Sequence, residues 1–134
     1  RRTPCESGLC RVSLPHPPPV AHLVQNRRGL TDLNMIQDSL RREGAELVLH
    51  GHSHRATTCT IPGTSIPVIG TTSASHIASS PQKAAGWNQI TITAQPATWD
   101  ITVQRRALGT DGFMHDSEAG RVYSRHRHLP KTAV

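Results

Sequence analysis

The sequence predicts an α/β fold, because short apolar runs of strand length flank one segment with helical periodicity. Residues 9–14 and 46–50 are such runs, and residues 31–42 between them carry apolar side chains at helical spacing. Later in the chain, two strand-like segments separated by a short turn predict a β-hairpin. Strands, helix and hairpin in this order indicate a sheet with a helix packed on it.

The first predicted strand covers residues 9–14 (LCRVSL). Pro15 and the prolines at 17–19 end it, since proline has no backbone N–H to donate to a sheet ladder. His16 therefore lies in a loop that follows a strand directly.

The predicted helix covers residues 31–42. Leu33, Ile36 and Leu40 share one face, and Thr31 or Asp32 is placed to cap the first turn. Gly44 is a natural helix stop.

Three further segments have strand patterns. Residues 46–50 (ELVLH) and 66–69 (IPVI) are short buried-type strands, and residues 70–80 form a loop of small side chains. Residues 89–94 and 99–103 alternate apolar with polar side chains, which predicts the hairpin. We therefore divide the chain into a lead-in at residues 1–8, a folded part at 9–106, and a flexible tail without an apolar face at 107–134.

Composition excludes several classes of function. The formal net charge is +6, but the chain has one Tyr and one Phe, too few stacking side chains for a dedicated nucleic-acid surface. Its three cysteines form no CxxC pair, which favours a reducing compartment. No apolar run approaches the roughly 18–20 residues of a membrane span. We expect a cytoplasmic protein with no membrane contact.

Histidines follow two of the predicted strands, which is where α/β sheets place their binding crevices. His16 follows the first strand, and His52 and His54 follow residues 46–50. In an extended loop, residues two apart point to the same side, so His52 and His54 could face one metal centre or two adjacent ones. A second His-x-His pair at residues 126 and 128 follows no apolar run, and we interpret it as solvated sequence.

Two stretches around these histidines resemble motifs of calcineurin-like metallophosphoesterases. Residues 48–55 (VLHGHSHR) are similar to the family's VLHGHTHR, and residues 12–20 (VSLPHPPPV) to its VVLxHHPPV. The predicted helix lies between them, as in the family. The resemblance implies an α/β fold that is the C-terminal half of a four-layer αββα sandwich, and metal-dependent hydrolysis of phosphoesters.

The resemblance also implies a set of site residues. His16 and His52 would bind one ion of a binuclear centre of Mn, Fe or Zn, and His54 would bind the other. The nucleophile would be a hydroxide bridging the ions, so no catalytic side chain is identified in this chain. Four further residues are expected beside the ligands or the substrate: Gly51, Ser53, Pro17, which stands where the family has a second histidine, and Ser75.

The remaining ligands of the family come from Asp-x-His, GDxxD and GNH(D/E) motifs, and none of these occurs in the sequence. The resemblance therefore implies a truncated domain that is inactive alone. Its partners would be a phosphoester substrate and either the missing N-terminal half, which would also supply the second sheet, or an oligomer partner. The alternative is a small histidine-rich domain that binds zinc or another protein without catalysis.

Overall fold

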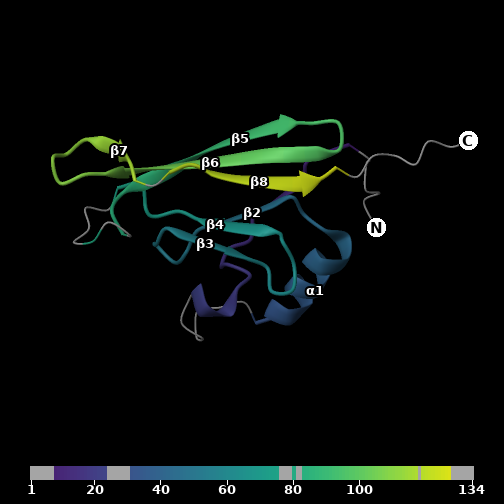
Figure 1. Cartoon of the computed structure of the whole chain (residues 1–134). Coiled ribbons are helices and arrows are strands. Elements are labelled where there is room, and N and C mark those ends of the chain that lie inside the picture. Colours follow the sequence, from purple (N-terminus) through teal and green to yellow (C-terminus); the bar gives the residue numbers. More distant parts are fainter. Residues whose placement is uncertain (1–7, 24–30, 76–79, 81–82, 118, 128–134) are drawn as a thin grey trace, which may run out of the picture.

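In this computed structural model, the described residues are 8–23, 31–75, 80, 83–117 and 119–127. They form two four-stranded sheets that pack face to face, with one α-helix on the far side of the first sheet (Figure 1). The predicted α/β class is confirmed. In the described part of the chain, no helix is long and apolar enough to cross a membrane. The elements in chain order are β1 (Val12–Ser13), a 3-10 helix η1 (Ala21–Leu23), α1 (Leu33–Glu43), β2 (Leu47–His50), β3 (Thr57–Thr60), β4 (Pro67–Gly70), β5 (Gly86–Ala94), β6 (Thr98–Leu108), β7 (Met114–Asp116) and β8 (Arg121–His126).

The first sheet has the strand order β1-β2-β4-β3. β2 runs parallel to both β1 and β4, with Leu47 opposite Val12 and Val48 opposite Val68, while β3 is antiparallel to β4. The carboxyl ends of β1, β2 and β4 therefore meet at one end of the sheet, and so do the loops that follow them.

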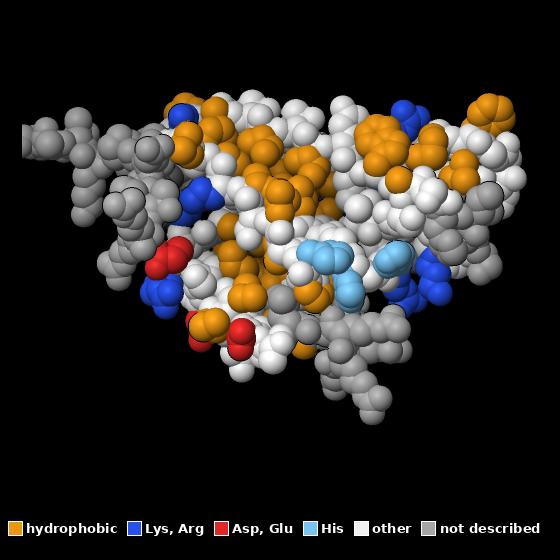
Figure 2. All heavy atoms as spheres, turned by 180° about the vertical axis from the view of Figure 1, so that it is seen from behind, with side chains coloured by type: hydrophobic (Ala, Val, Ile, Leu, Met, Phe, Trp, Pro, Cys, Tyr) orange, Lys and Arg blue, Asp and Glu red, His pale blue; other side chains and the backbone are white. Residues whose placement is uncertain are grey.

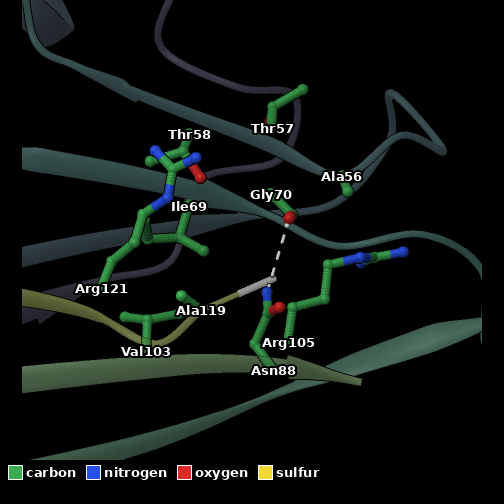
Figure 3. A pocket seen from close by; sticks show the side chains of 10 residues that line it. All are labelled: Ala56, Thr57, Thr58, Ile69, Gly70, Asn88, Val103, Arg105, Ala119 and Arg121. Atoms are coloured by element: carbon green, nitrogen blue, oxygen red, sulfur yellow. Dashed lines mark hydrogen bonds between the residues drawn. The ribbon is translucent and has the colours of Figure 1, made fainter. Parts of the chain in front are cut away.

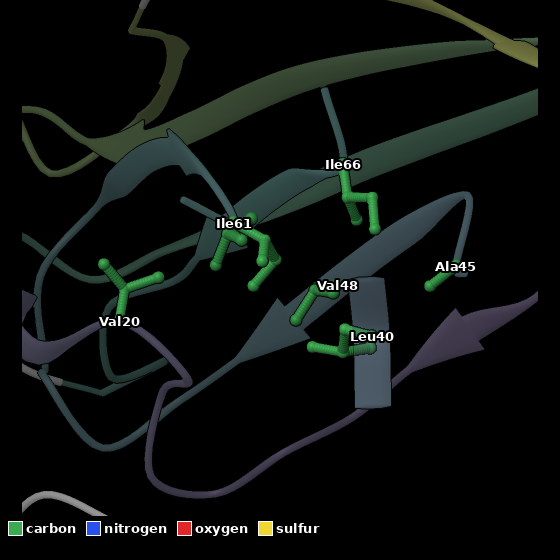
Figure 4. Packing of buried hydrophobic residues seen from close by; sticks show 7 residues of the cluster. Val20, Leu40, Ala45, Val48, Ile61 and Ile66 are labelled. Carbon is green, nitrogen blue, oxygen red and sulfur yellow. The ribbon is translucent and has the colours of Figure 1, made fainter. Parts of the chain in front are cut away.

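Successive side chains of β2 face opposite ways and so divide the core into two layers. Val48 faces α1 and packs with Val20, Leu40 and Ile61, as Figure 4 shows. Leu47 faces the second sheet, in a cluster with Ile69, Ile101 and Val103. Both layers consist mainly of aliphatic side chains, which agrees with the low aromatic content of the sequence.

The helix agrees with its prediction to within two residues at its start and one at its end. Gly44, at φ 76°, ends it and donates its N–H to the Leu40 carbonyl at 2.9 Å. Gln37 lies buried on the inner face, and its Nε2 donates to the Pro19 carbonyl at 2.9 Å. The helix therefore holds the loop that follows β1.

β1 is shorter than the predicted run at residues 9–14, since only Val12 and Ser13 join the ladder. An ion pair immediately before them fixes the register. Arg11 meets Glu46 through Nη2–Oε1 at 2.8 Å and Nε–Oε2 at 3.2 Å, and the Arg11 backbone N–H also donates to Glu46 Oε2 at 2.5 Å. Glu46 is only 3% exposed, so its carboxylate depends on these donors.

The origin of the second sheet differs from what the sequence led us to expect. The predicted hairpin is present as β5 and β6, with antiparallel pairing from Gly86 opposite Ala107 to Ala94 opposite Trp99. However, a second sheet was expected only from a missing half, and this chain supplies one itself. β3 was not predicted either, because its sequence TTCT lacks large alternating apolar side chains.

The structure also differs from the flexible tail expected at residues 107–134. β6 continues to Leu108, and β7 and β8 both pair with β6. The expectation was wrong for these strands because backbone ladders need no apolar pattern, and Tyr123 alone joins the core cluster from β8. Residues 128–134 lie outside the described part.

Replacing Tyr123 with Ala should lower the free energy of unfolding by about 2 kcal/mol, because Tyr123 packs against the buried cluster between the sheets. Val122 is 68% exposed, so Val122→Thr should change it by less than about 0.5 kcal/mol. Urea unfolding measures both values. Equal effects of the two variants would show that β8 does not pack as described.

Replacing Arg11 with Met should lower the free energy of unfolding by about 1.5–3 kcal/mol, because the buried Glu46 carboxylate loses two hydrogen bonds from the side chain. Arg42 makes a similar pair with Glu43 at the exposed helix end. Arg42→Met should therefore cost about 0.5 kcal/mol or less in the same urea experiment. If the free energy of unfolding fell equally little in both variants, the ion pair of Arg11 would not fix the position of β1.

Candidate functional site

Two of the predicted histidines meet at the end of the first sheet. His16 follows β1 and His52 follows β2, and their ring centroids lie 5.0 Å apart with the planes at 83°. His16 is exposed and His52 is partly exposed, so both are accessible from solvent. Figure 2 shows histidine side chains gathered near the middle of one face, beside hydrophobic side chains.

The His16 loop is anchored in the core at its far end. Pro18 and Pro19 are fully buried, and Val20 belongs to the cluster under α1. At its near side, a Cβ placed on Gly51 would lie 3.5 Å from His16 Nδ1, in direct contact. This is an ordinary van der Waals distance, so the His16 ring packs closely against the backbone of the second loop without requiring glycine there.

The loop that carries His52 and His54 has a strained backbone. Both residues adopt left-handed conformations, with φ 69° for His52 and φ 50° for His54, and Ser53 donates its N–H to the Gly51 carbonyl at 2.8 Å. Such a conformation costs a residue other than glycine about 1–2 kcal/mol. Strain of this kind concentrates at functional sites, where other contacts hold it in place.

The structure does not bring the third predicted ligand to the pair. His54 is exposed, and it makes no hydrogen bond, ion pair or ring contact with any residue that the structure describes. Within this described part, no three His, Cys, Asp or Glu side chains gather as a metal-binding group. The geometry therefore offers two imidazoles together, with a third two residues along the same loop.

The other predicted site residues take varied positions. Pro17 follows His16 directly and is partly buried. Ser53 lies in the strained turn, and its Oγ donates to the Arg55 carbonyl at 3.5 Å. Ser75 is exposed and donates its N–H to Ser73 Oγ at 3.4 Å, and residues 76–79 beside it lie outside the described residues. Their expected roles near ligands or substrate stay predictions.

Sequence reasoning missed His50, a buried histidine at the end of β2. Its Nδ1 lies 2.9 Å from the Gly51 carbonyl and its Nε2 3.0 Å from Thr57 Oγ1. Burial lowers the pKa of His50, the bond to Gly51 opposes this, and the nearby charge of His16 lowers it further. The sequence contained one signal for His50, because a titratable residue ends an apolar strand there, next to Gly51. It contained none for Thr57, since only the pairing of the strands shows that Thr57 contacts His50.

A cavity of about 170 Å³ lies between the two sheets, and Thr57, the partner of His50, is one of the residues that line it (Figure 3). Thr57 and Gly70 are among the residues that line it from the first sheet, and Asn88, Arg105 and Arg121 are among those from the second. The Arg105 guanidinium is buried and donates to Thr72 Oγ1 at 3.4 Å. These residues are far apart in sequence, so only the packing of the two sheets reveals the cavity.

The left-handed conformation of His54 predicts an unusual order of stability. His54→Gly should be more stable than His54→Ala by about 1 kcal/mol, because only glycine adopts this φ without strain. At the exposed Thr58 in β3, Thr58→Gly should instead be less stable than Thr58→Ala. Thermal unfolding of the four variants measures both differences. If the Gly and Ala variants had the same order of stability at both positions, the backbone at His54 would not be strained as described.

Comparisons with known proteins give distant structural similarities. No protein-family model and no curated protein matches the chain. The chain is similar to two crystal structures of Vps29 from Entamoeba histolytica. A double mutant is 13% identical with a TM-score of 0.42, over 74% of this chain and 48% of that one. The wild type complexed with Zn²⁺ is 17% identical with a TM-score of 0.40, and the match covers 72% of this chain and 48% of that one. The chain thus spans about half the length of these structures.

Proposed function

We propose that this chain carries the histidine half of a binuclear metal centre that hydrolyses phosphoesters, as in the calcineurin-like metallophosphoesterases. One observation carries the proposal: His16 and His52 leave two adjacent parallel strands and bring their rings within 5.0 Å of each other. The resemblance of residues 12–20 and 48–55 to the family's motifs supports the same assignment. The ions would be Mn, Fe or Zn.

The spacing of the two rings suits a shared ion. A histidine nitrogen binds zinc at about 2.0–2.1 Å, which places the ring centre about 3.2 Å from the metal. At tetrahedral angles, two such rings have centres about 5 Å apart. The separation of the His16 and His52 centroids, 5.0 Å, matches this value.

The two histidines supply only part of such a centre. A pair of divalent ions lowers the pKa of a bridging water and clamps the phosphoryl oxygens of the substrate. His16 and His52 would hold one ion through neutral ring nitrogens, and His54 would contribute to the second. The carboxylates that neutralise two ions belong to motifs absent from this sequence. We therefore assign them to an N-terminal half or an oligomer partner.

A second candidate is a domain that binds zinc or another protein without catalysis. Among the described residues no three His, Cys, Asp or Glu side chains gather, so this candidate rests on the paired rings of His16 and His52. The catalytic candidate and the zinc-binding form of the second candidate both require metal binding at His16 and His52. They differ in whether the site hydrolyses phosphoesters once the missing carboxylates are supplied.

The chain alone should bind one Zn²⁺ weakly and show no metal-stimulated hydrolysis of bis(p-nitrophenyl) phosphate, because it lacks the bridging carboxylate. His16→Ala and His52→Ala should each abolish zinc binding in calorimetry. His126→Ala, an exposed histidine on β8, should leave it unchanged.

Adding an N-terminal half that contains the three missing motifs should then produce activity that His52→Ala removes. Zinc binding without activity in this complemented protein would favour the non-catalytic domain. Metal-dependent turnover by the chain alone, lost in His52→Ala, would show that the proposed division of the site is wrong.

A further inference from the structure

We propose that His50 is a positioning residue, fixed in its Nδ1–H tautomer, that holds the turn presenting His52 to His16. Its effect on metal affinity rests on the function proposed above. Its effect on the turn does not, because that follows from hydrogen bonds within the chain.

The sheet register places three residues side by side across three strands. His50 of β2 lies opposite Gly70 of β4, and Gly70 lies opposite Thr57 of β3. The His50 ring passes over the middle strand, and its Nε2 meets Thr57 Oγ1 at 3.0 Å. A Cβ on Gly70 would lie 2.5 Å from His50 Cε1, closer than atoms approach. Glycine in the middle strand therefore makes the bond between the outer two strands possible.

These two contacts determine where the ring proton lies. The Gly51 carbonyl can only accept a hydrogen bond, so Nδ1 of His50 at 2.9 Å must carry the hydrogen. In the neutral ring, Nε2 then accepts from the Thr57 hydroxyl at 3.0 Å. Both ring nitrogens are engaged, so His50 acts on the site through the backbone and not as a ligand.

The Gly51 carbonyl transmits this constraint to the loop. It accepts two hydrogen bonds, one from His50 Nδ1 and one from the Ser53 N–H at 2.8 Å. The peptide unit of that carbonyl leads directly into His52, whose φ is 69°. Holding the carbonyl between two donors stabilises the left-handed turn, and the turn places the His52 ring against His16. Without the His50 donor, we expect the turn to relax and the two rings to separate.

Two amide substitutions test the two hydrogen bonds of His50 one at a time. The Asn amide nitrogen lies about where Nδ1 lies, so His50→Asn can still donate to the Gly51 carbonyl. The longer Gln side chain places its amide near Nε2, so His50→Gln can reach Thr57 but loses the bond to Gly51. In ¹⁵N-labelled protein, wild type should show the Nδ1–H tautomer of His50 and NOEs between the His16 and His52 rings. His50→Asn should keep these NOEs, and His50→Gln should lose them.

Zinc titration of the same proteins gives the second readout. Zinc affinity should fall about tenfold or more in His50→Gln, the scale on which residues behind metal ligands act, and should recover in His50→Asn. Tyr123→Ala, which removes a side chain from the cluster between the sheets, should lower stability without changing the NOEs or the affinity. If wild type binds no zinc, the metal centre proposed above is wrong, while the NOEs still decide the role of His50. An Nε2–H tautomer, or intact NOEs in His50→Gln, would overturn that role.

Discussion

The ion pair between Arg11 and Glu46 is the constraint on which the geometry of the site depends. β1 has only two residues in its ladder, too few to fix its own position beside β2. The Glu46 carboxylate is buried at the start of β2, and Arg11 meets it with two side-chain nitrogens and its backbone N–H. Because a slip by one residue would leave that carboxylate without these donors, the pair sets the register. The register in turn decides how far His16 lies from His52.

A second set of contacts holds the other side of the pair. The His52 turn is strained at two histidines, and a strained backbone persists only where its surroundings oppose relaxation. The hydrogen bonds to the Gly51 carbonyl supply that opposition, and Gly70 leaves room for the ring that makes one of them. The site is therefore held from the sheet beneath it, through residues that carry no metal-binding role themselves.

Sequence patterns predicted the parts of this fold that depend on local chemistry. The sequence predicted the helix that ends at Gly44, the hairpin of β5 and β6, and the strands before His16 and Gly51. Each of these elements has its own turn or cap signal. The polar strands β3 and β8 were not, since pairing with β4 and β6 stabilises them more than their own side chains do. The same limit applies to the site. His16, His52 and His54 were predicted to converge, and the rings of His16 and His52 meet while His54 makes no ring contact with them. His50 and Thr57 become partners only through Gly70.

The second sheet restricts how a metal centre here could be completed. Leu47 and Ile69 already pack against Ile101 and Val103, so the inner face of the first sheet is filled by this chain. The opposite face is covered by α1 and Val20. The edge at β1 exposes apolar side chains in the described structure, with Leu9, Val12 and Leu14 exposed at 58%, 39% and 73%. His16 follows that edge directly. Carboxylates from another segment or subunit would therefore reach the histidines along β1 or past the strand ends, and would displace neither sheet.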